Sequence, residues 1–480
     1  MNTAIPAADP AQLGDLNAIV KNYDIRGLVG DTITEPLVTA VGAATVDELD
    51  LAGHEIFIGH DMRDSSPAFA AAFARGAAVR GAKPVLLGYC STDMTYFISG
   101  RENAAAAMFT ASHNPAAYNG MKLSAAGARG ISLDTGLGAI RDRAAAYLRD
   151  GIPAASDTVA EATERDVLSD YATYLRELVD LSGIRPLKIV VDAGNGMAGK
   201  TVPAVLGSGC ELPKLPLEIV PMYFELDGNF PNHEANPLDP KNLVDLQQRV
   251  VAEGADLGLA FDGDADRCFL VDERGNPVSP SAVCAIVAAR EVERVRSAGE
   301  TDVTVIHNLL VSRHVIETIE SISAAPVRTR VGHSLIKAEM ARTNAVFGGE
   351  HSAHYYFRDF WGADNGMLAA MHMLAHVGSQ TAPMSKIAAE HTPYFASGEI
   401  NSTVADIPAA YERLVTEFSG VASVDELDGL TFSFEGRDWW WVNVRPSNTE
   451  PLLRLNVEAA TPEQMEQVRD LTLALIRDER

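Results

Sequence analysis

The feature that most constrains the fold is an alternation of short apolar segments with helical stretches. Between Glu55 and Lys122, apolar runs at Glu55–His60 and Ala104–Thr110 flank an alanine-rich helical stretch from Pro67 to Arg80. Apolar runs separated by helical patterns predict strands in βαβ units. The same rhythm returns with apolar runs at Leu187–Val191, Leu217–Pro221, Leu257–Phe261 and Cys268–Val271. We therefore expect three successive α/β units.

The pattern changes after about Gln380, where consecutive strands follow one another without intervening helices. The expected strands are Leu430–Phe434, Trp439–Val444 and Leu452–Val457. A final helix should begin after Thr461, because Thr461 is a good N-cap, Pro462 suits the first helical position and Gln464 can complete a capping box. This last part is predicted to be an α+β domain.

The length of the chain agrees with several domains. It has 480 residues, and roughly 150 residues per domain would give about three. The pattern of elements raises this to four, three similar α/β domains with mixed sheets and a C-terminal α+β domain. The expected boundaries are 1–155, 156–254, 255–378 and 379–480.

The charge of the chain excludes several partners. Acidic residues outnumber basic ones by 65 to 39, which gives a net charge of −26 and disfavours nucleic acid and anionic membranes. We see no secretory signal and no apolar run long enough to span a bilayer, so we expect a cytoplasmic protein. The four cysteines lie far apart and should be free thiols; they are Cys90, Cys210, Cys268 and Cys284.

Three carboxylates follow the expected strand Leu257–Phe261, at Asp262, Asp264 and Asp266. Three like charges held close together are unfavourable unless a divalent cation binds them, and an all-oxygen set favours magnesium, calcium or manganese. An EF-hand is excluded because Arg267 occupies the position that needs glycine. An arginine beside a metal site suits phosphoryl transfer.

A loop at the end of another expected strand contains Thr110, Ser112, His113, Asn114 and Pro115. Ligands in open α/β sheets sit at such strand ends. Ser112 could serve as a nucleophile, but a hydroxyl is weak unless it is activated. A plain structural turn therefore remains an alternative for this loop.

The segment Gly194–Thr201 satisfies the pattern of a P-loop, with Lys200 in the phosphate-contacting position. An ATPase or an ATP-dependent sugar kinase is thus one hypothesis. It would leave the Ser112 loop without a role, and a glycine-rich strand-to-helix turn explains the same residues through backbone geometry.

Two further loops are rich in hydrogen-bonding groups. Gly348–His354 carries Glu350, Ser352 and His354, which suit sugar hydroxyls, and a surface loop is the alternative. Arg445–Pro451 offers a guanidinium, hydroxyls and an amide, the components of a phosphate-binding nest, although a turn would use similar residues.

Taken together, the chain resembles the α-D-phosphohexomutase family, which includes phosphomannomutase and phosphoglucomutase. The resemblance runs from Tyr23-Asp-Ile-Arg-Gly27 to the Arg445–Pro451 loop, with five motifs in the order of the family. It implies four domains around a central cleft, with each domain contributing a loop. It also assigns the Gly194 loop to a structural turn in the second domain.

The resemblance implies a role for each motif. Ser112 would carry the phosphoryl group, with His113 beside it; Lys122 would act as general acid/base and Arg267 would assist. The metal would be Mg²⁺, held by Ser112, Asp262, Asp264 and Asp266. The substrate would be contacted by Tyr23, Arg26, His333, Glu350, Ser352, His354, Arg445, Ser447, Asn448 and Thr449.

Two positions depart from the family pattern. A lysine that is frequent near Leu310 is missing, so a phosphate contact would be lost or supplied from elsewhere, such as Arg313. His351 stands where Met or Gln is frequent. The segment that follows, Ser352 to Phe360, is more similar to bacterial phosphomannomutases than to phosphoglucosamine mutases.

The resulting hypothesis is a phosphohexomutase that interconverts mannose 6-phosphate and mannose 1-phosphate, with glucose phosphates as further substrates. Phosphorylated Ser112 would form a hexose bisphosphate, and a hexose 1,6-bisphosphate would prime the enzyme. The alternatives are the Lys200-centred kinase, a phosphoglucosamine mutase and a sugar-phosphate sensor without turnover. The partners would be small hexose phosphates, not nucleic acid or membrane, and the protein a monomer or a weak homodimer.

Overall fold

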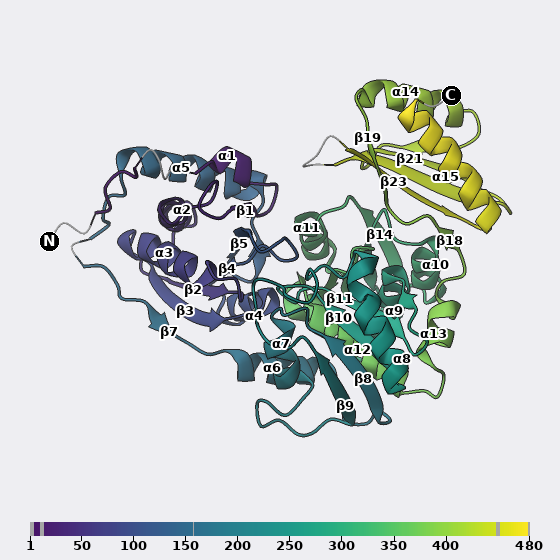
Figure 1. The fold of residues 1–480 in the computed structure, drawn as a ribbon, viewed down its shortest axis with the longest axis horizontal. Coiled ribbons are helices and arrows are strands. Elements are labelled where there is room, and N and C mark those ends of the chain that lie inside the picture. The colour runs from purple at the N-terminus through teal and green to yellow at the C-terminus, as the bar shows by residue number, and fades with distance from the viewer. Residues whose placement is uncertain (1–3, 10–13, 157, 448–451, 479–480) are drawn as a thin grey trace. The chain divides into compact units, whose positions relative to one another are not determined.

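The structure is a computed structural model that describes residues 4–9, 14–156, 158–447 and 452–478, without the His333 side chain. The chain divides into two compact units, residues 1–278 with 352–385 and residues 279–351 with 386–480. Figure 1 labels the helices and strands along the chain. No helix in the described ranges combines the length and apolar character that a bilayer crossing requires.

The first unit begins with a mixed sheet in the order β1-β5-β4-β2-β3-β7, with β6 paired to β5. Strands β4, β2, β3 and β7 run parallel, whereas β1 and β6 pair with β5, and β5 with β4, in antiparallel fashion. The strands are β1 (Ile25–Leu28), β2 (Glu55–His60), β3 (Lys83–Tyr89), β4 (Ala105–Phe109), β5 (Tyr118–Ala125), β6 (Arg129–Gly130) and β7 (Thr163–Glu164).

Helices accompany this sheet, and two of them cross closely. A Cβ on Gly42 of α2 would lie 2.3 Å from the carbonyl oxygen of Phe73 in α3, so the small residues of both helices let their backbones approach. The helices are α1 (Leu16–Ile19), α2 (Glu35–Glu48), α3 (Ser66–Val79), α4 (Thr92–Glu102) and α5 (Leu137–Asp150), with the 3-10 turn η2 (Leu133–Thr135).

The second sheet of this unit has the order β12-β11-β10-β8-β9. Strands β10, β8 and β9 are parallel, and β11 forms an antiparallel hairpin with β10. The boundary expected between residues 254 and 255 falls inside this sheet. The strands are β8 (Leu187–Asp192), β9 (Leu217–Met222), β10 (Leu257–Phe261), β11 (Cys268–Asp272) and β12 (Pro277–Val278). The accompanying helices are α6 (Leu168–Leu178), α7 (Ala198–Val205) and α8 (Val244–Glu253), with η3 (Pro240–Leu243).

The third α/β domain contributes elements to both units. The second unit contains the parallel strands β14 (Ala325–Thr329), β13 (Thr304–Asn308) and β15 (Phe347–Gly349). Its helices are α9 (Pro280–Ser297), α10 (Arg313–Ser321) and α11 (His333–Thr343). The first unit contains the antiparallel pair β16 (Tyr355–Phe357) and β17 (Ala363–Asp364), the turn η4 (Arg358–Phe360) and α12 (Gly366–Gly378). The helix α13 (Met384–Glu390) follows.

The C-terminal domain has an antiparallel sheet in the order β18-β23-β22-β21-β20, with β19 also paired to β23. Its strands are β18 (Phe395–Ala396), β19 (Ile400–Thr403), β20 (Ser423–Asp425), β21 (Leu430–Phe434), β22 (Trp440–Pro446) and β23 (Leu452–Ala459), and its helices are α14 (Ile407–Phe418) and α15 (Pro462–Arg477). The Thr461 side chain caps α15 by accepting from Gln464 N at 3.2 Å. The predicted fold class, three α/β domains with mixed sheets and an α+β domain, is confirmed.

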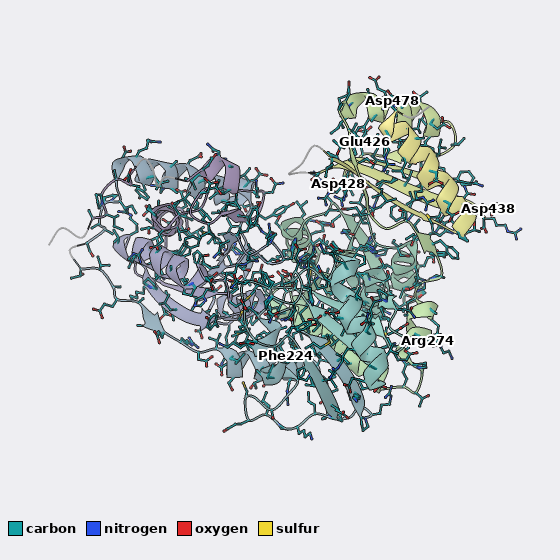
Figure 2. All side chains as sticks on the ribbon, in the orientation of Figure 1. Phe224, Arg274, Glu426, Asp428, Asp438 and Asp478 are labelled. Atoms are coloured by element: carbon teal, nitrogen blue, oxygen red, sulfur yellow. The ribbon has the colours of Figure 1, made fainter. Side chains whose placement is uncertain are left out.

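The large negative charge lies partly on exposed side chains. Figure 2 shows Glu426, Asp438 and Asp478 on the C-terminal domain, and all three are exposed. The four cysteines are free, and all but Cys210 are buried.

Candidate active site

Ser112 lies in a tight loop between β4 and β5. Every residue of β4 is buried, and Pro115 can donate no backbone hydrogen bond, so the chain leaves the sheet here. Ser112 is 3% exposed and has a φ of 50°, in the left-handed region that non-glycine residues seldom adopt. Its backbone N donates to Thr110 Oγ1 at 2.8 Å and its Oγ donates to Asp262 Oδ2 at 2.9 Å.

The three aspartates occupy the loop of the β10–β11 hairpin. Asp262, Asp264 and Asp266 are each 1% exposed or less, and one oxygen of each lies within 4.8 Å of the others. The loop also touches the serine loop directly, because a Cβ on Gly263 would lie 2.5 Å from the Ser112 carbonyl oxygen. Only glycine permits this close approach of two backbones.

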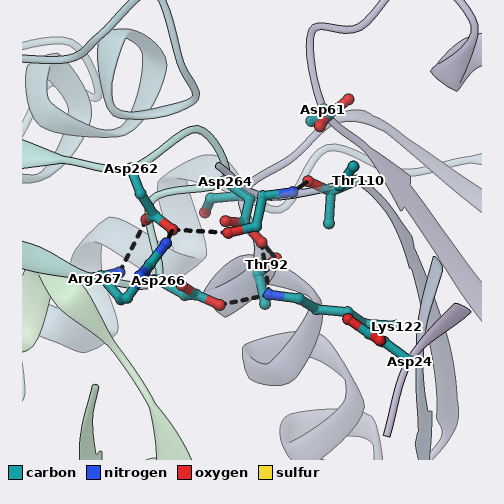
Figure 3. Close-up of polar contacts among 12 residues, drawn as sticks. Asp24, Asp61, Thr92, Thr110, Lys122, Asp262, Asp264, Asp266 and Arg267 are labelled. Carbon is teal, nitrogen blue, oxygen red and sulfur yellow. Dashed lines mark hydrogen bonds and ion pairs between the residues drawn. The ribbon is translucent and has the colours of Figure 1, made fainter. Parts of the chain in front are cut away.

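Three cations surround these carboxylates in the same unit. Lys122 of β5 donates to Asp264 Oδ2 at 2.7 Å and to Asp266 Oδ2 at 2.6 Å, and Arg267 Nε donates to Asp262 Oδ2 at 2.9 Å (Figure 3). Arg26 of β1 donates to Asn114 Oδ1 at 2.7 Å and to the Ala111 carbonyl at 3.3 Å. The serine hydroxyl therefore lies in a buried cluster of both charge signs.

Burial and neighbouring charges shift the pKa values of the residues in this cluster in different directions. Burial, with the nearby Asp266 and Asp264 carboxylates, raises the pKa of Asp262 to about 8 in spite of Arg267. Burial would also raise the pKa of Asp264, but the Lys122 ammonium outweighs it and holds that pKa well below its usual range. Burial would lower the pKa of Lys122, but Asp264 and Asp266 hold it well above its usual range. The cluster can therefore accept further positive charge.

The residues fit a divalent cation. Among the described residues, Asp264 Oδ1 and Asp266 Oδ1 are buried and have no hydrogen-bond partner, a costly state for a carboxylate oxygen. Oxygen ligands from carboxylates are those that Mg²⁺ prefers. A second group of ligating side chains shares Asp266 and adds His354 and Asp364.

His113 is held as a neutral acceptor. Arg267 Nη2 donates to His113 Nδ1 at 2.6 Å, and this nitrogen also lies 3.1 Å from Ser112 Oγ. Burial, together with Arg267 and Arg26, keeps the pKa of His113 well below its usual range. The ring is therefore neutral at physiological pH, with no proton on the nitrogen that faces Ser112.

The first unit brings the four predicted catalytic residues together, and two of the predicted sugar contacts also belong to it. Ser352 Oγ lies 2.9 Å from His354 Nδ1, and His354 approaches Asp266 as described above. Tyr23 lies between α1 and β1, three residues before Arg26.

The remaining predicted contacts belong to the second unit. Glu350 is 2% exposed and accepts from Asn308 Nδ2 at 3.1 Å and from Gly332 N at 3.4 Å. His333 is the first residue of α11. The neighbouring His351 pairs with Ser281 Oγ at 2.9 Å, and burial lowers the pKa of its imidazole.

The loop predicted to bind phosphate, Arg445–Pro451, lies only partly within the described residues. Arg445 donates from Nη2 to Glu399 Oε2 at 2.7 Å, and within the described ranges its buried Nε has no partner. Ser447 accepts from Arg454 Nη2 at 3.4 Å, which makes Arg454 a cation of this region that sequence reasoning missed. Asn448 and Thr449 lie outside the described residues.

Arg313, expected as a substitute for the missing lysine, is already engaged. Its Nε donates to Glu317 Oε1 and its Nη1 to Glu435 Oε2, each at 3.0 Å. Because its guanidinium is paired with two carboxylates, a phosphate would have to compete with both of them.

The Gly194 loop does not form a phosphate cradle. The amides that a P-loop would direct at phosphates donate to the protein instead. Gly194 N donates a hydrogen bond to Asp192 Oδ1, and Asn195 N donates to the Tyr223 carbonyl. Gly196 N donates to the Ala193 carbonyl, and Met197 N donates to the Gly263 carbonyl. The Lys200 ammonium donates to the Tyr89 carbonyl at 2.7 Å. Nothing in this geometry supports the kinase hypothesis.

Sequence reasoning missed two residues that hold parts of the site in place through hydrogen bonds. Thr92, at the start of α4, donates from Oγ1 to Asp264 Oδ2 at 2.6 Å. Arg63 donates to the Ser112 carbonyl at 2.9 Å. Neither residue lies in a motif, so only the tertiary structure identifies them.

Known protein families match the chain over most of its length. Models of the four phosphoglucomutase/phosphomannomutase domains match residues 17–147, 169–275, 279–395 and 399–475. A Xanthomonas campestris pv. campestris protein named "Phosphohexose mutases" is 40% identical over 91% of this chain and 94% of its own length. The Escherichia coli K12 "Phosphomannomutase" is 35% identical over 96% and 98%, respectively.

Solved structures agree with these sequence matches. The crystal structure of a phosphoglucomutase/phosphomannomutase family protein from Burkholderia thailandensis superposes with a TM-score of 0.82 at 27% identity, over 95% of this chain and 97% of that one. The predicted family is thereby confirmed. The chain belongs to the phosphoglucomutase/phosphomannomutase family and is a phosphohexomutase, an isomerase that moves a phosphoryl group between positions of a hexose.

Proposed function

We propose that the enzyme interconverts mannose 6-phosphate and mannose 1-phosphate through a phosphoserine at Ser112 and a hexose bisphosphate. The observation that carries this proposal is the buried Ser112 hydroxyl, 2.9 Å from Asp262 within a cluster of three carboxylates, Lys122 and Arg267. The preference for mannose rests on relatives named phosphomannomutase that align over more than nine-tenths of this chain.

Each half-reaction balances as one P–O bond exchanged for another. The bond between phosphorus and Ser112 Oγ breaks while a bond forms from phosphorus to the free sugar hydroxyl. Lys122 gives a proton to the seryl oxygen and takes up the proton that the sugar hydroxyl releases. In the second half-reaction the other phosphoryl group of the bisphosphate returns to Ser112. The product therefore carries the phosphoryl group that came from Ser112, and the phosphoryl group that the substrate brought remains on Ser112, so the phosphate has changed position on the sugar.

The residues around Ser112 can serve these steps. Asp264 and Asp266 stabilise the ammonium form of Lys122, which can give a proton to the oxygen that leaves phosphorus and take one back in the reverse direction. The Arg267 guanidinium, 4% exposed, can stabilise negative charge on the transferring group. His113, neutral and bonded to Arg267, keeps that guanidinium in place.

We propose that Asp262, Asp264, Asp266 and Ser112 hold Mg²⁺. When bound, the cation would neutralise negative charge on the phosphoryl oxygens. The unpartnered oxygens of Asp264 and Asp266 support this assignment. We assign the sugar and its second phosphate to Tyr23, Arg26, His333, Glu350, Ser352, His354, Arg445, Ser447, Asn448 and Thr449.

The test is a comparison of turnover on mannose 1-phosphate, glucose 1-phosphate and glucosamine 1-phosphate, with Mg²⁺ and glucose 1,6-bisphosphate as primer. We expect the highest kcat/KM on mannose 1-phosphate, measurable turnover of glucose 1-phosphate and little of the glucosamine compound. A clear preference for glucosamine 1-phosphate would contradict the assigned substrate. Turnover that needs ATP and not the bisphosphate would contradict the phosphoserine route.

A further inference from the structure

The shape of the Ser112 loop requires an explanation. Ser112 has a positive φ, which costs free energy in a residue with a side chain. Four backbone carbonyls of this segment accept hydrogen bonds from one side chain; they are those of Ser112, Asn114, Pro115 and Tyr118. Whatever binds these four oxygens also sets the direction of the serine side chain.

The group that binds them is the guanidinium of Arg63, which lies between β2 and α3 and is 2% exposed. Its Nη1 donates to the Pro115 and Tyr118 carbonyls, each at 2.9 Å, and its Nη2 donates to those of Ser112 at 2.9 Å and Asn114 at 2.7 Å. Its Nε donates to Asp61 Oδ2 at 3.2 Å. A guanidinium has five N–H groups, and all five are used.

Arg63 is itself fixed from several directions. Asp61 Oδ1 accepts from Arg63 N at 3.0 Å and from Ser66 Oγ at 2.6 Å, so its carboxylate is held in place. The Phe230 ring lies 5.2 Å from the guanidinium carbon, in the range of a cation–π contact. A Cβ on Gly228 would lie 2.6 Å from Arg63 Cα, so a loop of the second domain packs against the arginine backbone.

We propose that Arg63 is a positioning residue that holds the Ser112 loop in its left-handed conformation, with the seryl oxygen directed at Asp262. The inference rests on the proposed role of Ser112 as the phosphoryl carrier. Arg63 acts through the backbone carbonyls of the loop. Its loss should therefore slow phosphoryl transfer, which depends on the position of one oxygen, more than it weakens binding of the sugar.

Arg63→Lys is the most informative replacement. It keeps the positive charge beside Asp61. An ammonium, however, carries its three N–H donors on one nitrogen and cannot bind all four carbonyls that the planar guanidinium binds. The matched control is Arg176→Lys. Arg176 of α6 also binds three carbonyls, those of Val205, Gly207 and Pro213, but none of them belongs to the serine loop.

The measurements are kcat and KM on mannose 1-phosphate and the rate at which labelled glucose 1,6-bisphosphate phosphorylates Ser112. We expect Arg63→Lys to lower kcat and the phosphorylation rate by about 100-fold, with KM within about threefold of wild type. Arg176→Lys should stay within about twofold of wild type in all three. Phosphorylation of Arg63→Lys at the wild-type rate, or an equal loss in Arg176→Lys, would overturn the inference.

A second variant covers the case in which Arg63→Lys does not fold. Phe230→Leu leaves every donor of Arg63 in place but removes the ring over the guanidinium, and we expect phosphorylation to slow by about two- to tenfold. An unchanged rate in Phe230→Leu would then overturn the inference. If wild-type enzyme takes up no label at Ser112, the proposed function itself fails. If only the variants behave like wild type, the role of Arg63 alone fails.

Discussion

Thr92 and Asp264 are joined by two hydrogen bonds. Thr92 Oγ1 donates to Asp264 Oδ2 at 2.6 Å, and Thr92 N donates to the Asp264 carbonyl at 3.1 Å. Thr92 is fully buried at the start of α4. The helix thus fixes the backbone and the carboxylate of the central aspartate in the loop that we propose to bind the metal.

Thr92→Val tests this contact with little change in volume. A hydrogen bond to a charged group contributes about 1.5–3 kcal/mol, so we expect kcat to fall by about tenfold or more. The control is Thr45→Val in α2, where a buried hydroxyl donates at 2.8 Å to the Val41 carbonyl. That variant should keep wild-type kcat, and equal losses in both variants would assign Thr92 to general stability.

Lys122→Met removes the counter-charge of Asp264 and Asp266. We expect kcat to fall by about 10²–10⁴-fold, the usual contribution of a general acid/base. Without added cation, two buried carboxylates lose their partner, which should destabilise the fold by about 3–5 kcal/mol. The measurements are steady-state kinetics and denaturant unfolding. The control is Lys188→Met, which removes a surface lysine paired with Glu253 and should change neither kcat nor the free energy of unfolding. A near-wild-type kcat in Lys122→Met would exclude the proposed proton transfer.

Removal of divalent cations should abolish turnover. Dialysis against EDTA is expected to leave an inactive protein with a lower Tm, because the repulsion within the carboxylate cluster is then unrelieved, and added Mg²⁺ should restore both. Asp266→Asn should raise the Mg²⁺ concentration needed for half-activation. Asp272→Asn, which changes a buried carboxylate that binds loop backbone and Asn276, should leave this Mg²⁺ concentration unchanged. Full activity after exhaustive chelation would exclude a metal requirement.

The stability of the fold should depend on pH through His307 of β13. Burial lowers the pKa of this imidazole to about 4, whereas an unfolded histidine titrates near 6.5. The unfolded chain therefore binds more protons between these values, so stability is complete above pH 6.5 and falls as the pH drops toward 4. Urea unfolding of His307→Gln should show a difference between pH 7 and pH 4.5 that is smaller by about 2–3 kcal/mol than in wild type. An unchanged difference would contradict the buried neutral histidine.

Much of the fold could be predicted from the sequence where strands carry several buried apolar residues. The structure has β10 at Leu257–Phe261 and β21 at Leu430–Phe434, the bounds expected from their apolar residues. The very short strands were not predicted, since β7 at Thr163–Glu164 is exposed and forms only by pairing with β3. In such strands the tertiary pairing decides the structure, and local pattern carries no signal.

In the candidate site, too, residues with a local sequence pattern could be predicted and residues that act through tertiary contacts could not. Asp262 and Ser112 stand in distinctive loops at strand ends, so the sequence could identify them as candidates for the site. Arg63 and Thr92 lie outside every motif and act only through contacts with residues far along the chain. Lys200 is a case in which a complete motif is misleading. The P-loop pattern around it is complete in the sequence, but its ammonium donates to the Tyr89 carbonyl. Local sequence cannot show which backbone amides a loop has already used.

The central claim is that Ser112 carries the phosphoryl group. Incubation with labelled glucose 1,6-bisphosphate and Mg²⁺, followed by peptide mass spectrometry, should place one phosphoryl group on Ser112, and added mannose 1-phosphate should remove it. Ser112→Ala should take up no label and should isomerise mannose phosphates at least about 10⁴-fold more slowly than wild type. Unchanged isomerisation by Ser112→Ala, or label on another residue, would contradict the account.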